Sequence, residues 1–345
     1  MKYRKQTLTE LDHVYAVSVM QHENEPWVFF AAENRGACVA FDCASHEQKK
    51  TVWEQPGGTM SMVEIPGREG EFLAVQKFYR LYEWEEACLV WVKPNDQGGF
   101  DTKELFTLPY LHRFDLLRRD GRTFLVVCSL AAHKKTRDDW SEPGSVCAAV
   151  LPSNWDEPIE LKEILSGCFQ NHGYARIREE AYDVGLSTCE QGVFRLIPPA
   201  VDSDEWTIEK IMDQATSDAD LIDLDGDGEA EIATIERFHG CYFRIYKKVD
   251  GVYQQVYQHP EVSEFYHVVK AGTLAGHPCF VGGCRRGKQH LFVVYWDAAA
   301  GMFVTETVEE GVGPSNAYIF NGPQGDVIYS ANREAAHAAV YYVEE

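Results

Sequence analysis

Short apolar stretches, rich in β-branched and aromatic side chains, recur along the whole chain and are separated by Gly, Pro and Asp. This pattern is typical of β-strands joined by tight turns. A convincing amphipathic helix hardly appears. We therefore expect a protein that is mostly β.

The strands group into seven units of nearly constant length. Each unit has a first strand, a tight turn, a second strand and a third strand, and units one to six add a more polar fourth strand. The units begin near residues 13, 59, 112, 172, 218, 267 and 315. Such repetition predicts an all-β, seven-bladed β-propeller that forms a single domain over residues 1–345.

Unit seven lacks a fourth strand of its own. Residues 3–10, which precede unit one, have the polar alternation of a fourth strand. Pairing them with unit seven would close the ring and protect the edges of the sheets. The alternative is a β-sandwich with irregular hairpins, which the nearly equal units disfavour.

The net charge and the cysteine pattern limit which partners and which cellular compartment we expect for this protein. The net charge of −22 repels phosphate backbones and anionic lipids, so we expect neither nucleic acid nor a membrane as a partner. No secretory signal and no run of 18 apolar residues is present, which predicts a soluble, cytoplasmic protein. The ten cysteines form no CxxC pair and are expected to be buried, reduced thiols.

An acidic, glycine-rich turn joins the first two strands of unit five. Asp223, Asp225 and Asp227 alternate in it and Glu231 follows, an arrangement of oxygen ligands that suits calcium. The glutamate comes at position 9 instead of 12 and strands flank the loop, so it is not an EF-hand. The segment resembles the calcium loops of FG-GAP and VCBS-type propeller repeats, which implies a structural ion. An acidic turn without metal is the alternative.

Polar residues also recur at the start of the innermost strand of every unit. Because these strands line the channel of a propeller, their side chains should surround one axial cavity. Imidazoles from separate blades suit a transition metal or acid–base chemistry near neutral pH. The predicted metal ligands are His13, His112, His172, His267 and, from a nearby loop, His239. The alternative is a wet channel mouth lined by polar groups.

The loops after the second strands should open on the same face, and they carry many basic residues. Such a rim would attract an anionic ligand and hold its carboxylate or phosphate through arginine. The alternative is that each arginine pairs with a neighbouring glutamate. The predicted substrate-binding residues are Arg237, Arg285 and Arg333, and the predicted proton-transfer residues are His133, Tyr174 and Tyr266.

The motifs of serine hydrolases, zincins, P-loop proteins and Rossmann folds are missing from the sequence. The histidine ring resembles the plan of oligogalacturonate lyases, which bind manganese. The stretch HKKTRDDWSEPGSV, residues 133–146, resembles a segment of propellers related to aldos-2-ulose dehydratase, a metal-dependent carbohydrate lyase.

These resemblances imply a metal-assisted carbohydrate lyase or dehydratase that acts on a sugar or sugar acid, with a divalent transition metal or Mg²⁺ at the channel. Elimination needs a base for the α-proton and a cation that stabilises the enolate-like charge, and the rim offers both. The alternatives are a non-catalytic glycan- or protein-binding propeller, or a scaffold, with structural calcium in blade five.

Overall fold

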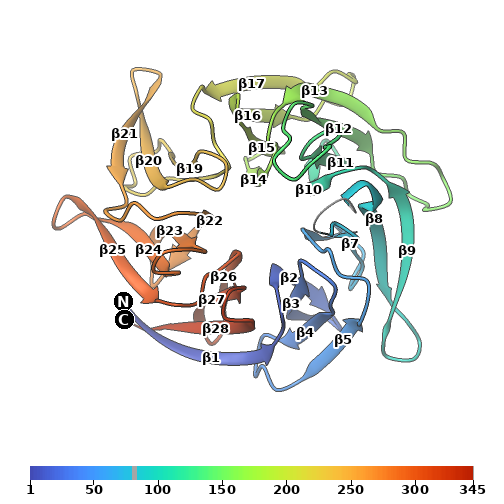
Figure 1. Cartoon of the computed structure of the whole chain (residues 1–345), viewed down its shortest axis with the longest axis horizontal. Coiled ribbons are helices and arrows are strands. Elements are labelled where there is room, and N and C mark those ends of the chain that lie inside the picture. Colours follow the sequence, from blue (N-terminus) through green and yellow to red (C-terminus); the bar gives the residue numbers. More distant parts are fainter. Residues whose placement is uncertain (80–83, 345) are drawn as a thin grey trace.

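The computed structural model describes residues 1–79 and 84–344, which form seven four-stranded antiparallel sheets arranged in a ring (Figure 1). Six sheets use four consecutive strands each, from the centre of the ring to its edge. One short 3-10 turn, Trp84–Glu86, is the helical element among the described residues. The prediction of an all-β, seven-bladed propeller is confirmed.

The blades follow the chain. Blade one contains β2 (Val14–His22), β3 (Glu25–Ala32), β4 (Cys38–Asp42) and β5 (Lys49–Trp53). Blade two contains β6 (Met62–Glu64), β7 (Phe72–Gln76), β8 (Cys88–Pro94) and β9 (Phe100–Thr107). Blade three contains β10 (Leu111–Arg119), β11 (Arg122–Ser129), β12 (Gly144–Val150) and β13 (Lys162–Cys168).

The remaining blades have the same order. Blade four contains β14 (Gly173–Arg178), β15 (Asp183–Cys189), β16 (Gly192–Ile197) and β17 (Thr207–Met212). Blade five contains β18 (Asp218–Ile222), β19 (Glu231–Glu236), β20 (Tyr242–Val249) and β21 (Val252–Gln258). Blade six contains β22 (Tyr266–Leu274), β23 (His277–Cys284), β24 (Leu291–Asp297) and β25 (Met302–Glu309).

Blade seven joins the two ends of the chain. It contains β26 (Asn316–Gly322), β27 (Gly325–Asn332), β28 (His337–Glu344) and, outermost, β1 (Lys2–Glu10). The β1–β28 ladder is antiparallel and runs from Lys2 opposite Glu344 to Glu10 opposite His337. The predicted closure of the ring by the N-terminal strand is therefore confirmed.

The second strand of each blade lies between two neighbouring sheets. β7 and β15 are buried along their whole length, and β3, β11, β23 and β27 are buried from their third residue onward. Sheets of adjacent blades pack through these strands, as where the Phe30 and Tyr329 rings lie 6.4 Å apart. Because neighbouring sheets cover both faces of these strands, the strands appear as continuous apolar runs in the sequence.

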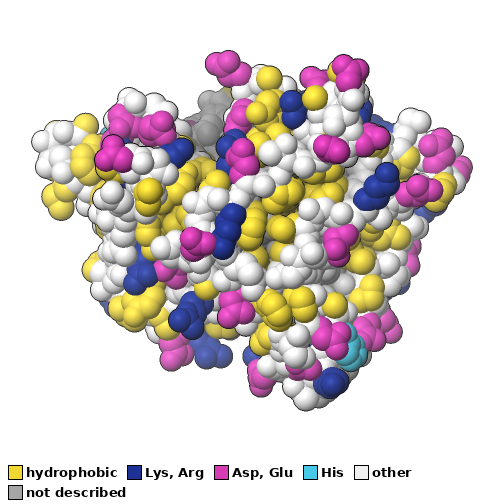
Figure 2. Space-filling model, turned by 90° about the horizontal axis from the view of Figure 1, so that it is seen from above, with side chains coloured by type: hydrophobic (Ala, Val, Ile, Leu, Met, Phe, Trp, Pro, Cys, Tyr) yellow, Lys and Arg dark blue, Asp and Glu magenta, His cyan; other side chains and the backbone are white. Residues whose placement is uncertain are grey.

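The outer surface mixes side chains of all kinds. Figure 2 shows one face of the molecule, where acidic, basic and apolar side chains are interspersed and no single kind covers the face. All ten cysteines lie in the described ranges and are free thiols. The described residues contain no helix with the length and apolar character needed to cross a membrane.

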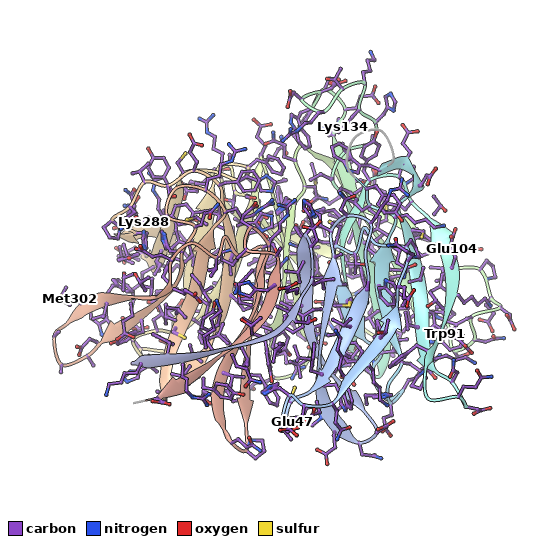
Figure 3. All side chains as sticks on the ribbon, turned by 60° about the horizontal axis from the view of Figure 1, so that its bottom comes forward. Glu47, Trp91, Glu104, Lys134, Lys288 and Met302 are labelled. Carbon is purple, nitrogen blue, oxygen red and sulfur yellow. The ribbon has the colours of Figure 1, made fainter. Side chains whose placement is uncertain are left out.

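One connection stands out from the ring. Residues 130–143 link β11 to β12, and Figure 3 shows the segment around Lys134 rising above one end of the propeller, at the end opposite Glu47. Side chains of this segment, called the 130–143 loop below, reach the wall of the axial channel.

Candidate metal and anion site at the channel

A cavity of about 880 Å³ lies at the end of the channel that receives the 130–143 loop. Its polar lining consists of His13, Tyr15, Glu33, His112, Arg137, Asp138, His172, His239, His267, Arg285, Arg286, Gln289, Arg333 and Glu334. Its apolar lining consists of Met60, Phe78, Trp84, Leu130, Trp140, Phe238 and Phe265. Four arginines thus face three carboxylates in a protein whose net charge is −22, so this cavity is basic relative to the whole.

Tyr15, His112 and His267 occupy the same position in three blades. In each, the pairing of the first strand with the second skips this residue, which is the mark of a β-bulge. A bulge releases one residue from the ladder and re-aims its side chain, here into the cavity. His172 reaches the same place without a bulge, directly before β14.

The Nδ1 atoms of three histidines are bound to acceptors. His112 Nδ1 lies 3.1 Å from the carbonyl of His172, and His267 Nδ1 lies 2.5 Å from the carbonyl of Ser315. His172 Nδ1 lies 2.7 Å from the Asp218 carboxylate. Carbonyl and carboxylate oxygens only accept, so each Nδ1 carries the proton and each Nε2 keeps a free lone pair. Metal-binding histidines are oriented in the same way.

Three imidazoles approach one another closely. The ligand atoms of His172, His239 and His267 all lie within 4.8 Å of one another, and the Nε2 atoms of His172 and His239 are 3.1 Å apart. That separation suits neighbouring ligands of a tetrahedral ion with metal–nitrogen bonds of about 2.0–2.1 Å. It also permits a hydrogen bond between the two rings when one Nε2 carries a proton. Phe265 stacks on His239 with the ring centroids 4.3 Å apart and fixes its orientation.

Burial sets the protonation state of this group. Burial, followed by the neighbouring imidazoles, lowers the pKa of His112, His239 and His267 well below the ordinary value of histidine. These rings are therefore neutral at pH 7. Neutral imidazole is the form that binds metal ions.

Tyr15 lies among these rings. Its hydroxyl is 3.4 Å from Nε2 of His112 and 3.4 Å from Nε2 of His267, and its side chain is buried. The single phenolic proton can serve one of the two nitrogens at a time. Burial raises the pKa of Tyr15 to about 12, so the hydroxyl keeps its proton at neutral pH.

A chain of ion pairs forms another part of the wall. Arg333 is 5% exposed, and its Nε and Nη1 donate to Glu33 and to Glu334, while Arg285 Nε lies 2.9 Å from Glu334. The buried Nη2 of Arg333 has no hydrogen-bond partner among the described residues. A buried donor without an acceptor costs free energy, which a ligand carboxylate or hydroxyl in the cavity would recover.

The 130–143 loop is held against the cavity by aromatic contacts. Lys134 is 6% exposed, and its Nζ lies 3.0 Å from the centroid of the Trp140 ring and 5.3 Å from that of Trp84. Burial lowers the pKa of Lys134 to about 8. Trp140 in turn meets Phe238 edge to face at 4.9 Å. The loop therefore contributes a fixed aromatic wall.

The structure brings four of the five predicted metal ligands into contact. His172, His239 and His267 form the close group, and the ring of His112 lies against that of His172, with centroids 4.4 Å apart. His112 is not part of the group of three whose ligand atoms lie within 4.8 Å of one another. It is placed to contact Tyr15 instead.

The predicted alignment of blade one was out of register. It placed His13 at the position of His112 and His267, but Tyr15 holds that position because the bulge lies there. His13 lies in the turn before β2, with its Nδ1 2.8 Å from the Asp12 carboxylate. It lines the cavity without joining the close group of imidazoles.

The two predicted tyrosines lie away from the histidines. Tyr174 lines the opposite end of the channel, and its hydroxyl is buried against Gly185. Two residues along a strand cover roughly 6.6 Å, which carries Tyr174 past the cavity that His172 lines. Tyr266 precedes the bulge by one residue and points into the packed core, where its hydroxyl meets His259 and the carbonyl of Glu261.

His133 and Arg237 also lie outside the cavity lining. His133 is exposed at the surface, and its Nδ1 is 3.0 Å from the Glu85 carboxylate. Arg237 is exposed and follows the end of β19. Of the predicted catalytic residues, Arg285 and Arg333 are the two that line the cavity.

Sequence reasoning missed the roles of Tyr15, Asp218 and the glutamates Glu33 and Glu334. Tyr15 could have been found by allowing a two-residue shift in blade one, since an aromatic hydroxyl at the channel position is as polar as the residues aligned with it. The glutamates occur in the loops already recognised as the rim. Their pairing with arginine depends on contacts between blades.

The acidic turn of blade five lies between β18 and β19, where it was predicted. Ligand atoms of Asp223, Asp225 and Asp227 lie within 4.8 Å of one another. The ammonium of Lys247 lies 2.5 Å from Asp225, 2.7 Å from Asp227 and 3.2 Å from Glu231. Calcium ligation stays a prediction, and Lys247 is the cation with which calcium would compete.

Comparisons with known proteins support the fold and nothing more specific. No family model and no curated protein matches the chain. Among solved structures, the β-propeller domain of Cps50 (Swd1) from Myceliophteria thermophila has a TM-score of 0.63, 12% identity and coverage of 99% of this chain and 100% of that one. A streptogramin B lyase has a TM-score of 0.60, 12% identity and coverage of 100% and 99%.

A third similar structure is the soluble aldose sugar dehydrogenase of Escherichia coli, with a TM-score of 0.50, 12% identity and 99% coverage of both chains. At these identities the likeness is one of fold alone. The similar structures are propellers of other types, so membership of the FG-GAP or VCBS families is not confirmed.

Proposed function

We propose that this protein is a metal-assisted lyase or dehydratase that acts on a small sugar acid in the histidine-lined cavity. The observation that carries the proposal is the group of His172, His239 and His267, whose ligand atoms lie within 4.8 Å of one another. The Nδ1–H groups of His172 and His267 are bound to acceptors, which leaves their Nε2 atoms unprotonated. These atoms could bind a metal in place of their present contacts with His239 Nε2 and the Tyr15 hydroxyl.

The donor set favours a borderline divalent metal such as Zn²⁺ or Fe²⁺ over Ca²⁺, because imidazole nitrogen suits these ions and calcium prefers oxygen. A bound ion of this kind would supply Lewis acidity, which stabilises negative charge that develops on a substrate oxygen. Asp218 would act as a positioning residue by holding His172.

Arg333 supports an anionic substrate. Its unpartnered Nη2 is buried in the wall of the cavity, and Arg285 lies on the other side of Glu334. A guanidinium N–H group in this position would donate to a substrate carboxylate. The aromatic wall formed by Trp140 and Phe238 would pack against the carbon skeleton of a sugar.

Tyr15 and His112 would transfer the proton. As the bond between the α-carbon and its hydrogen breaks, the proton moves to the Tyr15 oxygen and the phenolic proton passes to Nε2 of His112, 3.4 Å away. The electron pair forms the carbon–carbon double bond, the β-hydroxyl leaves, and the same pair of residues returns a proton to it. The products are an unsaturated acid and water.

The metal is tested by elemental mass spectrometry of the purified full-length protein and its variants. We expect bound transition metal in the wild type and its loss in His239→Ala and His267→Ala. The exposed His277, on β23, provides the control, and His277→Ala should keep the metal. Asp218→Asn should weaken metal binding by about 10- to 100-fold, as removal of an outer partner does. Equal metal content in His239→Ala and wild type would refute the site.

The activity is tested with a panel of sugar acids, by following the ultraviolet absorbance of the unsaturated acid and by mass spectrometry for the loss of one water. Tyr15→Phe should abolish turnover while the metal remains bound. Arg333→Lys keeps the charge but loses the free N–H group, so KM should rise by roughly tenfold.

A binding module for glycans is the second candidate, favoured by the aromatic wall of Trp140, Phe238 and Trp84. It predicts that sugar acids bind and are recovered unchanged by a protein that carries no transition metal.

A further inference from the structure

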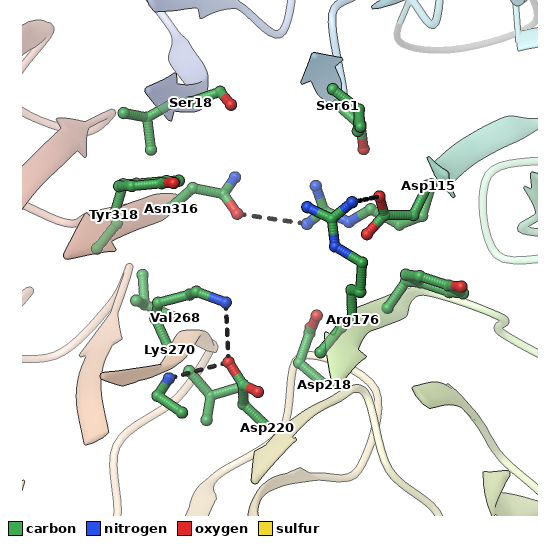
Figure 4. A pocket seen from close by; sticks show the side chains of 18 of the residues that line it. Ser18, Ser61, Asp115, Arg176, Asp218, Asp220, Val268, Lys270, Asn316 and Tyr318 are labelled. Atoms are coloured by element: carbon green, nitrogen blue, oxygen red, sulfur yellow. Dashed lines mark hydrogen bonds and ion pairs between the residues drawn. The ribbon is translucent and has the colours of Figure 1, made fainter. Parts of the chain in front are cut away.

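A second cavity, of about 780 Å³, lies at the other end of the channel. The innermost strands of all seven blades line it, and Figure 4 shows the polar side chains that they direct toward its centre. His267 and Met60 contribute to both cavities and so form part of the layer between them. This cavity shares no other lining residue with the histidine-lined site.

Two ion pairs lie in this second cavity. Arg176 Nη1 lies 3.3 Å from the Asp115 carboxylate, and Lys270 Nζ lies 3.0 Å from that of Asp220 (Figure 4). Asp218, which also lines the cavity, is bound to His172. Glu64 and Arg178 also line the cavity and form no ion pair among the described residues, so the cavity has four carboxylates and four cations.

Two cations of the cavity form no ion pair among the described residues, and Arg113 is the half-buried one, whereas Arg178 is exposed. Arg113 projects from β10, and its guanidinium donates to the carbonyl of Met60 at 2.6 Å and to Oδ1 of Asn316 at 3.5 Å. It forms no ion pair with a carboxylate of the described residues, and its other neighbour is the ring of Tyr15, 5.6 Å away. A partly buried guanidinium without a counter-charge is a ready partner for an anion.

Hydroxyl groups lie around this guanidinium. Ser18 and Tyr318 line the cavity, and their hydroxyl groups make no hydrogen bond to another described residue. The contact of the Ser61 hydroxyl with a backbone carbonyl is long, at 3.5 Å. In Figure 4, Ser18 and Ser61 lie along one side of the opening, and Tyr318 lies next to Asn316. Accessible hydroxyls beside a cation suit a ligand that carries hydroxyl groups in addition to its charge.

We propose that this second cavity binds a small hydroxy acid, with its carboxylate on Arg113 and its hydroxyl groups on Ser18, Ser61 or Tyr318. The planar fork of a guanidinium matches a carboxylate in two parallel hydrogen bonds, which favours it over a spherical anion. The proposal requires neither the metal nor the substrate proposed for the histidine-lined cavity, although His267 lines both cavities.

The test is isothermal titration calorimetry of the full chain with L-tartrate at low ionic strength, where electrostatic attraction is least screened. We expect saturable binding of one tartrate in the wild type. Tyr318→Phe removes one hydroxyl without changing the shape of the side chain and should weaken binding several-fold. Arg113→Gln should weaken it by roughly tenfold or more.

Two variants of the other cavity act as controls. Arg333→Lys and His239→Ala should bind tartrate as the wild type does, and thermal melting verifies that every variant is folded. The proposal is wrong if Arg113→Gln and Tyr318→Phe bind like the wild type, if binding is lost in Arg333→Lys or His239→Ala, or if no saturable binding is found. Tighter binding of inorganic phosphate than of tartrate would overturn the carboxylate assignment.

Discussion

A single hydrogen-bond acceptor beside each imidazole decides what the channel histidines can do. The Asp218 carboxylate and the carbonyl of Ser315 take the Nδ1 protons of His172 and His267, so the Nε2 lone pairs remain free. An identical set of histidines whose Nδ1 atoms accepted from hydrogen-bond donors would carry its protons on Nε2, would present N–H groups to the cavity and would bind an anion instead of a metal.

Lys134 provides a prediction at the same scale, because its buried ammonium has no hydrogen-bond acceptor among the described residues. Its folded pKa is about 8, below the ordinary 10.5. Between these values the folded side chain loses its proton while the unfolded one keeps it, so the unfolded state binds more protons and the free energy of unfolding rises with pH.

We expect Lys134→Met to remove this rise. Relative to the variant, the free energy of unfolding of the wild type should rise by on the order of 2–3 kcal/mol between pH 8 and 10.5. The rise is smaller by the amount that the cation–π contact with the Trp140 ring stabilises the charged ammonium. Urea unfolding at a series of pH values measures this difference. Lys135→Met is the neighbouring control, because Lys135 is exposed. Parallel curves for wild type and Lys134→Met would contradict the prediction.

At the scale of elements, β-bulges adapt a regular strand to a functional channel. The first strands of blades one, three and six would alternate side chains without interruption, and the bulge in each inserts one residue into the channel. In blade two, Met60, which precedes β6, lines the channel near this level, so the ring of polar residues is incomplete on that side.

The hairpin of blade five carries the calcium prediction. Lys247 supplies a positive charge to the acidic turn, so its removal leaves mutually repelling carboxylates that calcium would stabilise. We expect millimolar CaCl₂ to raise the melting temperature of Lys247→Met more than that of the wild type, and EGTA to reverse the change. Calcium at 100 times its Kd would stabilise the folded protein by about 2.7 kcal/mol.

Lys248→Met is the matched control, because Lys248 is adjacent and exposed. It should respond to calcium as the wild type does. If calcium leaves all three melting temperatures unchanged, the turn is an ordinary acidic hairpin and Lys247 is its counter-charge.

At the scale of the whole molecule, stability depends on the closure of the ring. β1 completes blade seven, and the amino group of Met1 lies 2.8 Å from the Glu306 carboxylate of blade six. The first strand of the chain therefore joins the last blade and contacts its neighbour. Without it, the edge of β28 would be exposed.

Deletion of residues 2–10, with Met1 retained, should lower the melting temperature by roughly 7 °C or more, since about 5 kcal/mol of lost stability has this effect in a chain of this size. The exposed edge should also promote association, which size-exclusion chromatography with light scattering detects. Glu306→Gln removes the ion pair while leaving β1 in place, and should lower the melting temperature much less than the deletion does. A deletion variant as stable as the wild type would show that closure contributes little.

The sequence by itself determined the blade count, the strand order and the closing strand. These follow from period-two alternation, turn residues and a repeat of nearly constant length, all of which are local signals. It also placed histidines and arginines near one end of the channel, because equivalent positions of a repeat meet at the axis. His112, His172, His267, Arg285 and Arg333 were identified in this way.

Only the tertiary structure decided which of these side chains meet. Tyr15 contacts His112 and His267 across 97 and 252 residues of sequence, through bulges that depend on how each strand pairs with its neighbour. Strand pairing also places Tyr174 and Tyr266 outside the histidine-lined cavity. A shift of one or two residues along a strand changes the face or the depth at which a side chain lies. The charge balance that leaves Arg113 without a carboxylate is likewise a sum over several blades, which no local pattern records.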